Sequence, residues 1–171
     1  MLHILSLAVL PTLLIVAATS DVMTYRIPNW LTLLTALLFF PMAMATAMPA
    51  AALTWHILAG VLLFVIGFGL FAFNLVGGGD VKLLGALGLW LGLGSLGNFF
   101  QALAYAGLVQ ALLMSAWAYI IFSMEIRSDA DSQIGLWSKL RTIKPNIPFG
   151  FAIALGGIVA FRDTWWLHGL Q

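Results

Sequence analysis

The sequence predicts an all-α polytopic membrane protein, a bundle of about six transmembrane helices, from its composition and the spacing of its charges. Of the 171 residues, 63% are hydrophobic and only 8% are charged. Soluble globular domains have about 45–50% hydrophobic and about 25% charged residues. The charges are separated by apolar stretches, each long enough for one or two crossings. The length predicts a single membrane-embedded domain over residues 1–171.

The composition also excludes several classes of protein. Seven basic and six acidic residues give a formal net charge of +1, too little for the basic surface of a nucleic-acid-binding protein. The chain has no cysteine, which excludes disulfides, iron–sulfur clusters and a cysteine nucleophile. We therefore expect the lipid bilayer as the surroundings, no nucleic acid as a partner and no cofactor.

The first crossing is predicted within residues 2–20, an apolar run that contains Pro11 and ends directly before Asp21. A helix of about 20 residues spans the hydrocarbon core of a bilayer. A cleaved signal peptide is the alternative, since Ala17 and Ala18 could precede a processing site. The basic n-region of such peptides is missing, which favours a membrane helix.

The uncharged stretch between Arg26 and Asp80 is too long for one crossing and too short for three, so it predicts two. Pro41 and Pro49 are expected to break helices within this stretch. The turn between the two crossings is predicted at residues 48–52.

Two more crossings are predicted between Lys82 and Glu125, separated by the glycine-rich residues 92–98. The apolar residues 147–161 predict a sixth, short crossing. Residues 128–144 are polar, but apolar side chains recur among them at helical spacing. They form either a helix at the membrane surface or a solvated loop.

Six crossings divide the basic residues unequally between the two membrane faces. If the first helix runs from outside to inside, only Arg162 lies outside, together with both termini. The basic residues on the inner side are then Arg26, Lys82, Arg127, Lys139, Arg141 and Lys144. Because cytoplasmic loops are enriched in Lys and Arg, this division supports the number and direction of the crossings.

The same count places two distant acids at one membrane face. Asp21 ends the first crossing and Asp80 begins the fourth, so an even number of crossings separates them. An ionised acid at or within a bilayer costs free energy. Such a residue is therefore expected to be a functional group, a paired charge or a surface anchor. The topology therefore allows Asp21 and Asp80 to meet.

Three glycines, Gly77, Gly78 and Gly79, directly precede Asp80. Such a run is costly in a helix, and it is tolerated where the backbone opens to line a cavity. An open backbone could hold an extended peptide substrate by strand addition. The alternative is a flexible turn with Asp80 as an ordinary helix N-cap.

The residues that follow Asp21 predict the entry into the second helix. Pro28 would stiffen this entry, Asn29 would cap the helix and Trp30 would lie at the interface. Arg26 fits the inner-side enrichment of basic residues. For Asp21 itself, a solvated acid in a loop remains the alternative.

Three motifs resemble those of the type IV prepilin peptidases. The first is Asp21 followed by Arg-Ile-Pro-Asn at 26–29, and the second is Gly-x-Gly-Asp at 77–80 followed by Val-Lys. The third is the Pro-aromatic-Gly stretch at 148–150, where the last crossing begins. Together the motifs cover the hydrophobic part of the chain in the order of that family.

The resemblance implies an intramembrane aspartic protease with Asp21 and Asp80 as its catalytic dyad. Its substrate would be a prepilin with a hydrophobic N-terminal helix, cut at the cytoplasmic face of the bacterial inner membrane. The short chain resembles the compact members that serve Flp, or tight-adherence, pili. The residues expected to bind substrate or shape the site are Gly77, Gly78, Gly79, Arg26, Pro28, Asn29, Lys82, Pro148 and Gly150.

Larger members of that family carry a cytoplasmic insert with paired cysteines and also methylate the new N-terminus. This chain has no cysteine and no such insert, so methyltransferase activity is not expected. The sequence does not indicate an oligomeric state.

Peptide hydrolysis by two carboxyl groups requires one ionised group, which takes a proton from water, and one protonated group, which polarises the scissile carbonyl. Two acids a few ångströms apart reach this state by repulsion, because the second proton is retained to higher pH. The titration belongs to the pair. The sequence does not show which of Asp21 and Asp80 is the base.

Other hydrolytic sites are not expected. His3, His56 and His168 are predicted near the outer surface, away from both acids, which excludes a Ser-His-Asp relay. The metalloprotease motif His-Glu-x-x-His is absent and Glu125 is the only glutamate. We predict no metal site.

Several other residues have structural interpretations. Lys82 is expected mainly as an anchor at the inner surface, and the small residues within 85–92 should allow close helix contact. The side chains expected to form hydrogen bonds between helices are Asn98, Gln101 and Gln110.

Two other functions fit the same acids. One is a small transporter or channel in which Asp21 and Asp80 bind cations or relay protons. The other is a catalytically silent scaffold for pilus assembly, for which neither acid would be needed.

Overall fold

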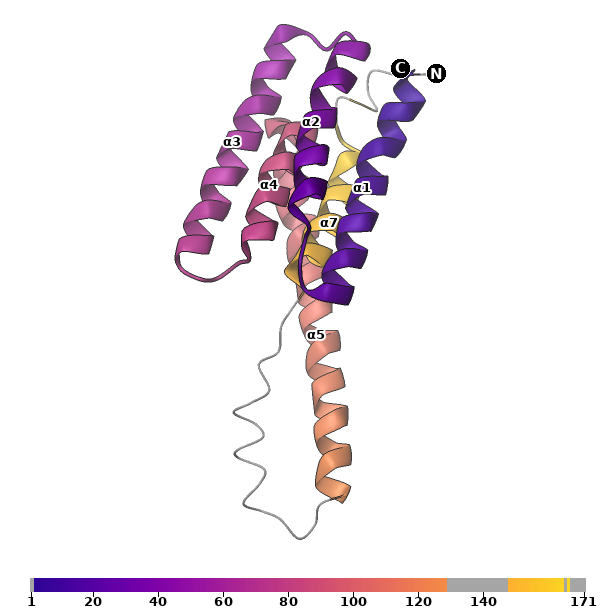
Figure 1. Ribbon diagram of the computed structural model, residues 1–171, viewed down its shortest axis with the longest axis vertical. Coiled ribbons are helices and arrows are strands. Elements are labelled where there is room, and N and C mark those ends of the chain that lie inside the picture. The colour runs from indigo at the N-terminus through magenta and orange to yellow at the C-terminus, as the bar shows by residue number, and fades with distance from the viewer. Residues whose placement is uncertain (1, 129–147, 165, 167–171) are drawn as a thin grey trace.

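The computed structural model describes residues 2–128, 148–164 and 166. These residues form six α-helices and one short 3-10 helix, and no strand occurs among them (Figure 1). The elements are α1 (Leu2–Thr24), α2 (Asn29–Ala45), α3 (Ala50–Ala72), α4 (Gly78–Leu91), η1 (Leu93–Ser95), α5 (Leu96–Ser128) and α7 (Phe149–Phe161). The predicted all-α bundle is confirmed.

Within the described part of the chain, three stretches are long and apolar enough to cross a membrane by length and composition. They are Leu7–Thr24, Ala50–Ala72 and Leu93–Met124. α2 and α7 are shorter apolar helices. Many large apolar side chains of α3 and α5 are exposed, which fits surfaces in contact with lipid. The chain is therefore an integral membrane protein.

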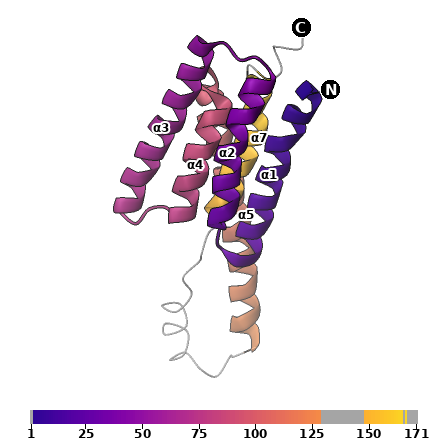
Figure 2. The same ribbon diagram turned by 45° about the horizontal axis from the view of Figure 1, so that its top comes forward.

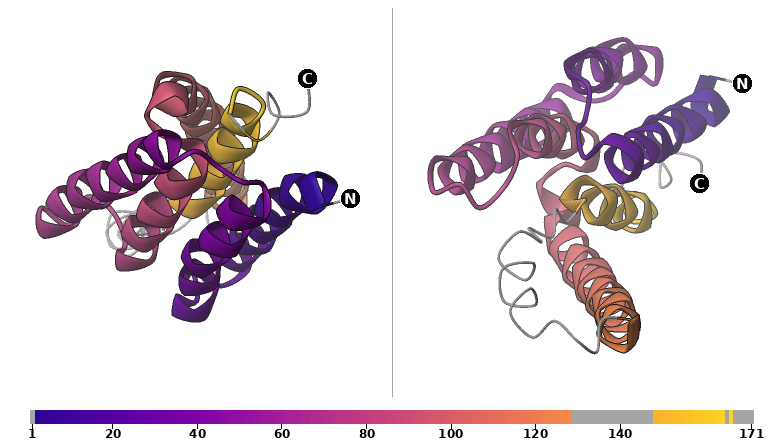
Figure 3. Two further views of the ribbon diagram at one scale, coloured as in Figure 1. Left: turned by 90° about the horizontal axis from the view of Figure 1, so that it is seen from above. Right: turned by 60° about the horizontal axis from the view of Figure 1, so that its bottom comes forward.

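α4 is the central helix of the bundle. It packs against α3 on one side and against α2 and α7 on the others, while α5 lies outside against α7 (Figures 2 and 3). Gly88 allows the close approach of α4 to α3, because a Cβ atom there would lie 2.6 Å from the carbonyl oxygen of Ala59. The expected close contact of the small residues in 85–92 is confirmed.

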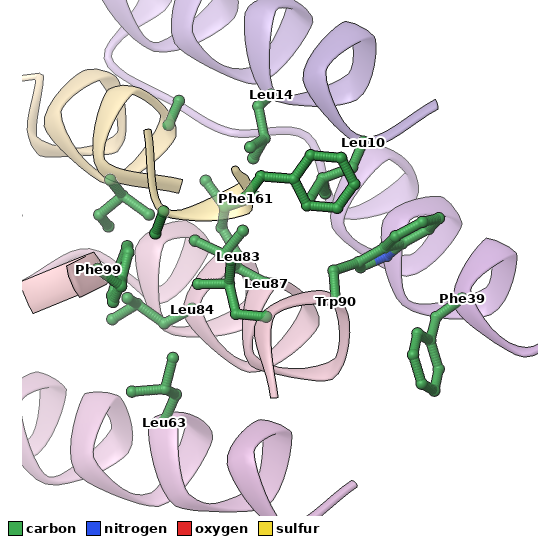
Figure 4. Packing of buried hydrophobic residues seen from close by; sticks show 14 of the residues in the cluster. Leu10, Leu14, Phe39, Leu63, Leu83, Leu84, Leu87, Trp90, Phe99 and Phe161 are labelled. Carbon is green, nitrogen blue, oxygen red and sulfur yellow. The ribbon is translucent and has the colours of Figure 1, made fainter. Parts of the chain in front are cut away.

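Side chains from every described α-helix fill the core around α4 (Figure 4). Leu87 and Trp90 project from α4, Leu14 from α1 and Phe39 from α2, and all four are fully buried. Complete burial of a large apolar side chain contributes about 1.5–3 kcal/mol relative to exposure in water. Within a bilayer this hydrophobic contribution is small, because the lipid is also apolar. Close packing between helices then stabilises the core instead.

Hydrogen bonds satisfy the buried polar groups at the end of the bundle where α4 ends. Trp90 Nε1 donates to the carbonyl oxygen of Thr35 at 2.8 Å, and Trp166 Nε1 donates to that of Trp90 at 2.8 Å. His56 Nδ1 lies 2.7 Å from the carbonyl oxygen of Leu89. A buried polar group needs such partners, so His56 has a structural role there.

The connection between α2 and α3 differs from the prediction. Pro41 does not break a helix but lies inside α2, and the connection runs from Thr46 to Pro49, slightly before the predicted turn at 48–52. Proline is tolerated inside membrane helices because neighbouring groups satisfy the freed carbonyl. Ala47, which has a φ of 51°, makes the turn.

The later boundaries follow the prediction. Gly92 ends α4 with a φ of 69°, and η1 then leads into α5, so the break at 92–98 is confirmed. The last crossing, predicted at 147–161, is α7. Of the predicted surface segment 128–144, only Ser128, the last residue of α5, lies within the described residues.

Candidate active site

Asp21 and Asp80 lie at the same end of the bundle. α1 and α3 end there and α2, α4 and α7 begin there (Figure 1). Asp21 belongs to the last turn of α1 and Asp80 to the first turn of α4. Ile27 connects the two acids: a Cβ atom at Gly79, next to Asp80, and one at Gly150, which contacts Asp21, would both lie against it. The structure thus places at one end of the bundle the two residues that the count of crossings placed at one face.

Asp21 is a buried helical residue and not a solvated loop acid. Its side chain is only 4% exposed. The helix continues to Thr24 and ends because Tyr25, with a φ of 52°, turns the chain. The hydroxyls of Ser20 and Thr24 then donate to the carbonyl oxygen of Arg26, at 2.9 and 3.1 Å. These bonds hold the segment between α1 and α2 against the end of α1.

The carboxylate of Asp21 meets the N-terminus of α7. The N–H of Phe151 donates to Oδ2 at 3.2 Å, and the Gly150 amide is a second donor to the same carboxylate. The free N–H groups and the dipole at a helix N-terminus stabilise an anion. A Cβ atom at position 150 would lie 2.8 Å from Asp21 Oδ2, so this approach needs glycine.

Asp80 caps its own helix through its side chain. Its Oδ2 accepts the N–H of Gly77 at 3.1 Å. Gly77 is extended, with a φ of −76° and a ψ of 152°, whereas Gly78 and Gly79 already belong to α4. The prediction of an open glycine backbone is therefore wrong for Gly78 and Gly79, and Asp80 is not the N-cap. The carboxylate satisfies the N–H of the N-cap residue Gly77, which offsets the low helix propensity of glycine.

Ile27 lies between the beginnings of α4 and α7. A Cβ atom at Gly79 would lie 3.1 Å from Ile27 Cβ, and one at Gly150 would lie 2.6 Å from Ile27 Cδ1. The side chain of Ile27 is buried. Ile27 belongs to the Arg-Ile-Pro-Asn motif, but its position between the two helices was not predicted. Its apolar character between Arg26 and Pro28 is the signal that could have indicated burial.

Asn29 does not cap α2. The N-cap is Pro28, which has no side-chain donor or acceptor for the helix, and Asn29 is the first helical residue. Its Oδ1 instead accepts a hydrogen bond from Lys82 Nζ at 2.7 Å. This bond joins α2 to α4 two residues beyond Asp80, a contact that the sequence did not predict. The side chain of Arg26 is exposed, and its carbonyl group makes the contacts described above.

Gln110, a residue of α5, holds the beginning of α7 in place. Its Nε2 donates to the carbonyl oxygen of Pro148 at 2.8 Å, and the side chain is buried. At the other end of α7, Asn98 Nδ2 donates to Asp163 Oδ2 at 2.9 Å. Gln110 and Asn98 thus form hydrogen bonds from α5, as predicted, but their partners Pro148 and Asp163 flank α7 and do not lie within it. Gln101 makes no such bond to another described residue.

Within residues 2–128, 148–164 and 166, no group of three or more His, Cys, Asp or Glu side chains is placed to hold a metal ion. His56 lies near the beginning of α3 and bonds near the end of α4, so it is at the end of the bundle opposite the acids. His168 is outside the described residues. Besides the two carboxyl groups and the backbone amides, the described residues at the acid end include the polar side chains of Arg26, Asn29 and Lys82.

The helical fold and the two buried acids define an integral membrane protein with a carboxylate site at one end. A model of the type IV leader peptidase family, Peptidase_A24, matches residues 8–124. The match covers more than half of the chain and includes both acids, so the chain belongs to this family and is a peptidase. Its substrate is of the prepilin type. No significant match occurs among curated proteins or solved structures.

Proposed function

We propose that this protein is an intramembrane aspartic endopeptidase in which Asp21 and Asp80 form the catalytic dyad. It removes the leader peptide of Flp-like type IV prepilins at the cytoplasmic face of the bacterial inner membrane. The observation that carries the proposal is that two buried acids from distant parts of the chain lie at one end of the bundle, on either side of Ile27. Family membership gives the reaction class.

Two carboxyl groups are sufficient for the hydrolysis. The ionised one takes a proton from a water molecule, whose oxygen attacks the scissile carbonyl carbon. The protonated one donates a hydrogen bond to the carbonyl oxygen and stabilises the charge that forms there. Collapse of the tetrahedral intermediate breaks the C–N bond, and the amine leaves with a proton from the dyad. Repulsion between Asp21 and Asp80 keeps one proton on the pair.

The surroundings of the acids support these roles. Backbone amides of α7 fix the orientation of the Asp21 carboxylate, and the Gly77 amide does the same for Asp80. Ile27 packs between the helix beginnings that supply these contacts. Fixed dipoles are more effective than water because they need no reorientation during the reaction.

The distribution of charge supports the cytoplasmic location of the site. Arg26 and Lys82 lie at the end of the bundle that holds the acids, and Arg162 lies at the other end. Basic residues are enriched on the cytoplasmic side of membrane helices. With this orientation, the enzyme cuts a leader at the point where the apolar helix of its substrate enters the membrane.

Co-expression with a candidate Flp-type prepilin tests the proposal. Asp21→Asn and Asp80→Asn should each abolish leader removal, because Asn cannot exchange a proton with water. Thr54→Val is the control, since this exposed polar side chain near the beginning of α3 lies at the other end of the bundle. Membrane-inserted Asp21→Asn or Asp80→Asn that still cuts the leader would contradict the assignment. Ion flux that depends on Asp80, without cleavage of any prepilin, would favour the transporter instead.

A further inference from the structure

An apolar groove runs along the outer surface of the bundle between α5 and α7. It has a volume of about 860 Å³. Its apolar walls include Val22 of α1, Phe151, Leu155 and Val159 of α7, and Val109 and Leu113 of α5. Figure 3 shows α5 on the outside of the bundle beside α7, away from α2 and α3. The groove therefore faces the surroundings of the protein and not its core.

One end of the groove is continuous with the carboxylate site. Phe151 lines the groove, and its N–H donates to Asp21 Oδ2. Val22 lines the same end and directly follows Asp21 in α1. A segment lying in the groove would consequently have one end beside Asp21.

The other end of the groove lies at the opposite end of the bundle. Asn98 and Asp163, which are hydrogen-bonded to each other, line it there. The groove follows α7, whose 13 residues are about 20 Å long. A helix of that length crosses most of the apolar core of a bilayer, which is about 30 Å thick.

The lining of the groove fits an apolar helix. Polar side chains occur mainly near its ends, and its middle is formed by aliphatic and aromatic groups. Ala102 and Ala106 leave room along α5, and small residues allow two membrane helices to approach closely. The window of α5 that could span a membrane is only 6% buried, so this helix has much free surface for a partner.

We propose that the groove between α5 and α7 docks the apolar helix of the prepilin-type substrate. The helix enters sideways from the bilayer and lies along α7, with its cytoplasmic end at Asp21 and the bond to be cut just beyond it. This inference rests on the proposed function, because it takes the substrate class and the catalytic acids from there.

A second groove, of about 570 Å³, lies among α2, α3 and α4. Lys82 and Asn29 line it, but they are bonded to each other, and neither bonds to an acid. The α5–α7 groove is favoured because a residue of its wall bonds directly to Asp21. The second groove provides matched control positions.

Blocking substitutions test the docking site. Ala106→Trp should fill the α5–α7 groove and Ala36→Trp the second groove; both alanines are half-buried lining residues. Each variant is assayed on a model prepilin with a basic leader, a glycine and an apolar helix, and on a peptide that ends shortly after the cut. Ala106→Trp should slow cleavage of the full substrate about tenfold and leave the short peptide nearly unchanged. Ala36→Trp should leave both nearly unchanged.

If Ala106→Trp cleaved the full substrate as fast as the wild type, the docking site would be overturned. The same holds if Ala36→Trp lost more of this cleavage rate than Ala106→Trp. Failure of the proposed function has a different result: Asp21→Asn would then cut both substrates like the wild type. The two failures are therefore distinguishable.

Photo-crosslinking tests the same site without catalysis. A benzophenone side chain is placed at Val109, Val159 or Val61, which are similarly exposed at 55%, 52% and 55%. Val61 belongs to the second groove. In the Asp80→Asn background, adducts with the model prepilin are expected at Val109 and Val159 and not at Val61. Adducts at Val61 alone, or with lipid alone at all three positions, would overturn the proposal.

Discussion

Gly150 lies so close to Asp21 that a Cβ atom at position 150 would be 2.8 Å from the carboxylate oxygen. The same Cβ atom would be 2.6 Å from Ile27 Cδ1. The beginning of α7 thus contacts both the acid and the residue that separates α7 from α4. Any side chain at position 150 must displace one of these groups.

Gly150→Ala should therefore lower leader cleavage by about tenfold or more, because displacement of a catalytic group by about an ångström has effects of this size. Gly107→Ala on α5 is the matched control, since a Cβ atom there meets nothing within 4 Å. Cleavage of a prepilin in membranes, normalised to the amount of enzyme, measures both. Full activity of Gly150→Ala would show that the close contact is not required.

Gln110→Leu should destabilise the protein by about 0.5–1.5 kcal/mol, because it removes one of the two hydrogen bonds to the buried carbonyl of Pro148, which still accepts the N–H of Phe151 at 3.2 Å. Gln101→Leu is the control: Gln101 lies on the same helix, is exposed, and makes no bond to another described residue. Unfolding of the purified proteins in detergent with increasing denaturant measures the difference. Equal stability of the two variants would contradict the role of Gln110.

Lys82→Met and Asn29→Leu should lose the same interaction, since Lys82 Nζ donates to Asn29 Oδ1 at 2.7 Å. Because Lys82 is exposed, the coupling free energy in a double-mutant cycle should be only about 0.5–1 kcal/mol. The cycle is measured as the free energy of unfolding of the two single variants and the double variant. Strictly additive effects would show that the bond does not contribute to stability.

Gly88→Ala should destabilise the bundle by about 1–3 kcal/mol, because the new Cβ atom would lie 2.6 Å from the backbone carbonyl oxygen of Ala59. Neither backbone can move aside without separating α3 from α4. Gly97→Ala, near the beginning of α5, should be close to neutral because a Cβ atom there meets nothing within 4 Å. Thermal unfolding in detergent compares the two, and a neutral Gly88→Ala would contradict the close packing.

Charge spacing predicted most of the fold correctly. A polar residue or a glycine-rich break ends most of the apolar stretches, so the helix boundaries near Asp80, Gly92 and Phe149 follow from the sequence. Counting crossings also placed Asp21 and Asp80 at one end. Pro41 was misread because the rule that proline ends a helix applies less strictly in membrane proteins.

The details of the site could be predicted only in part. The donors to Asp21 are backbone amides 130 positions away, and such groups leave no pattern in side-chain identity. The partner of Asn29 depends on how α2 and α4 are placed side by side, which charge spacing does not describe. The glycines before Asp80 were misread because the carboxylate caps the helix that they begin.

The position of Ile27 makes the geometry of the site depend on the size of one aliphatic group. It acts as a spacer between the beginnings of α4, which carries one acid, and α7, which holds the other. Alanine, valine and isoleucine at this position would form a graded series of gaps without any change of charge. A natural or engineered change in the spacing of the two acids can therefore arise at a residue that takes no part in proton transfer.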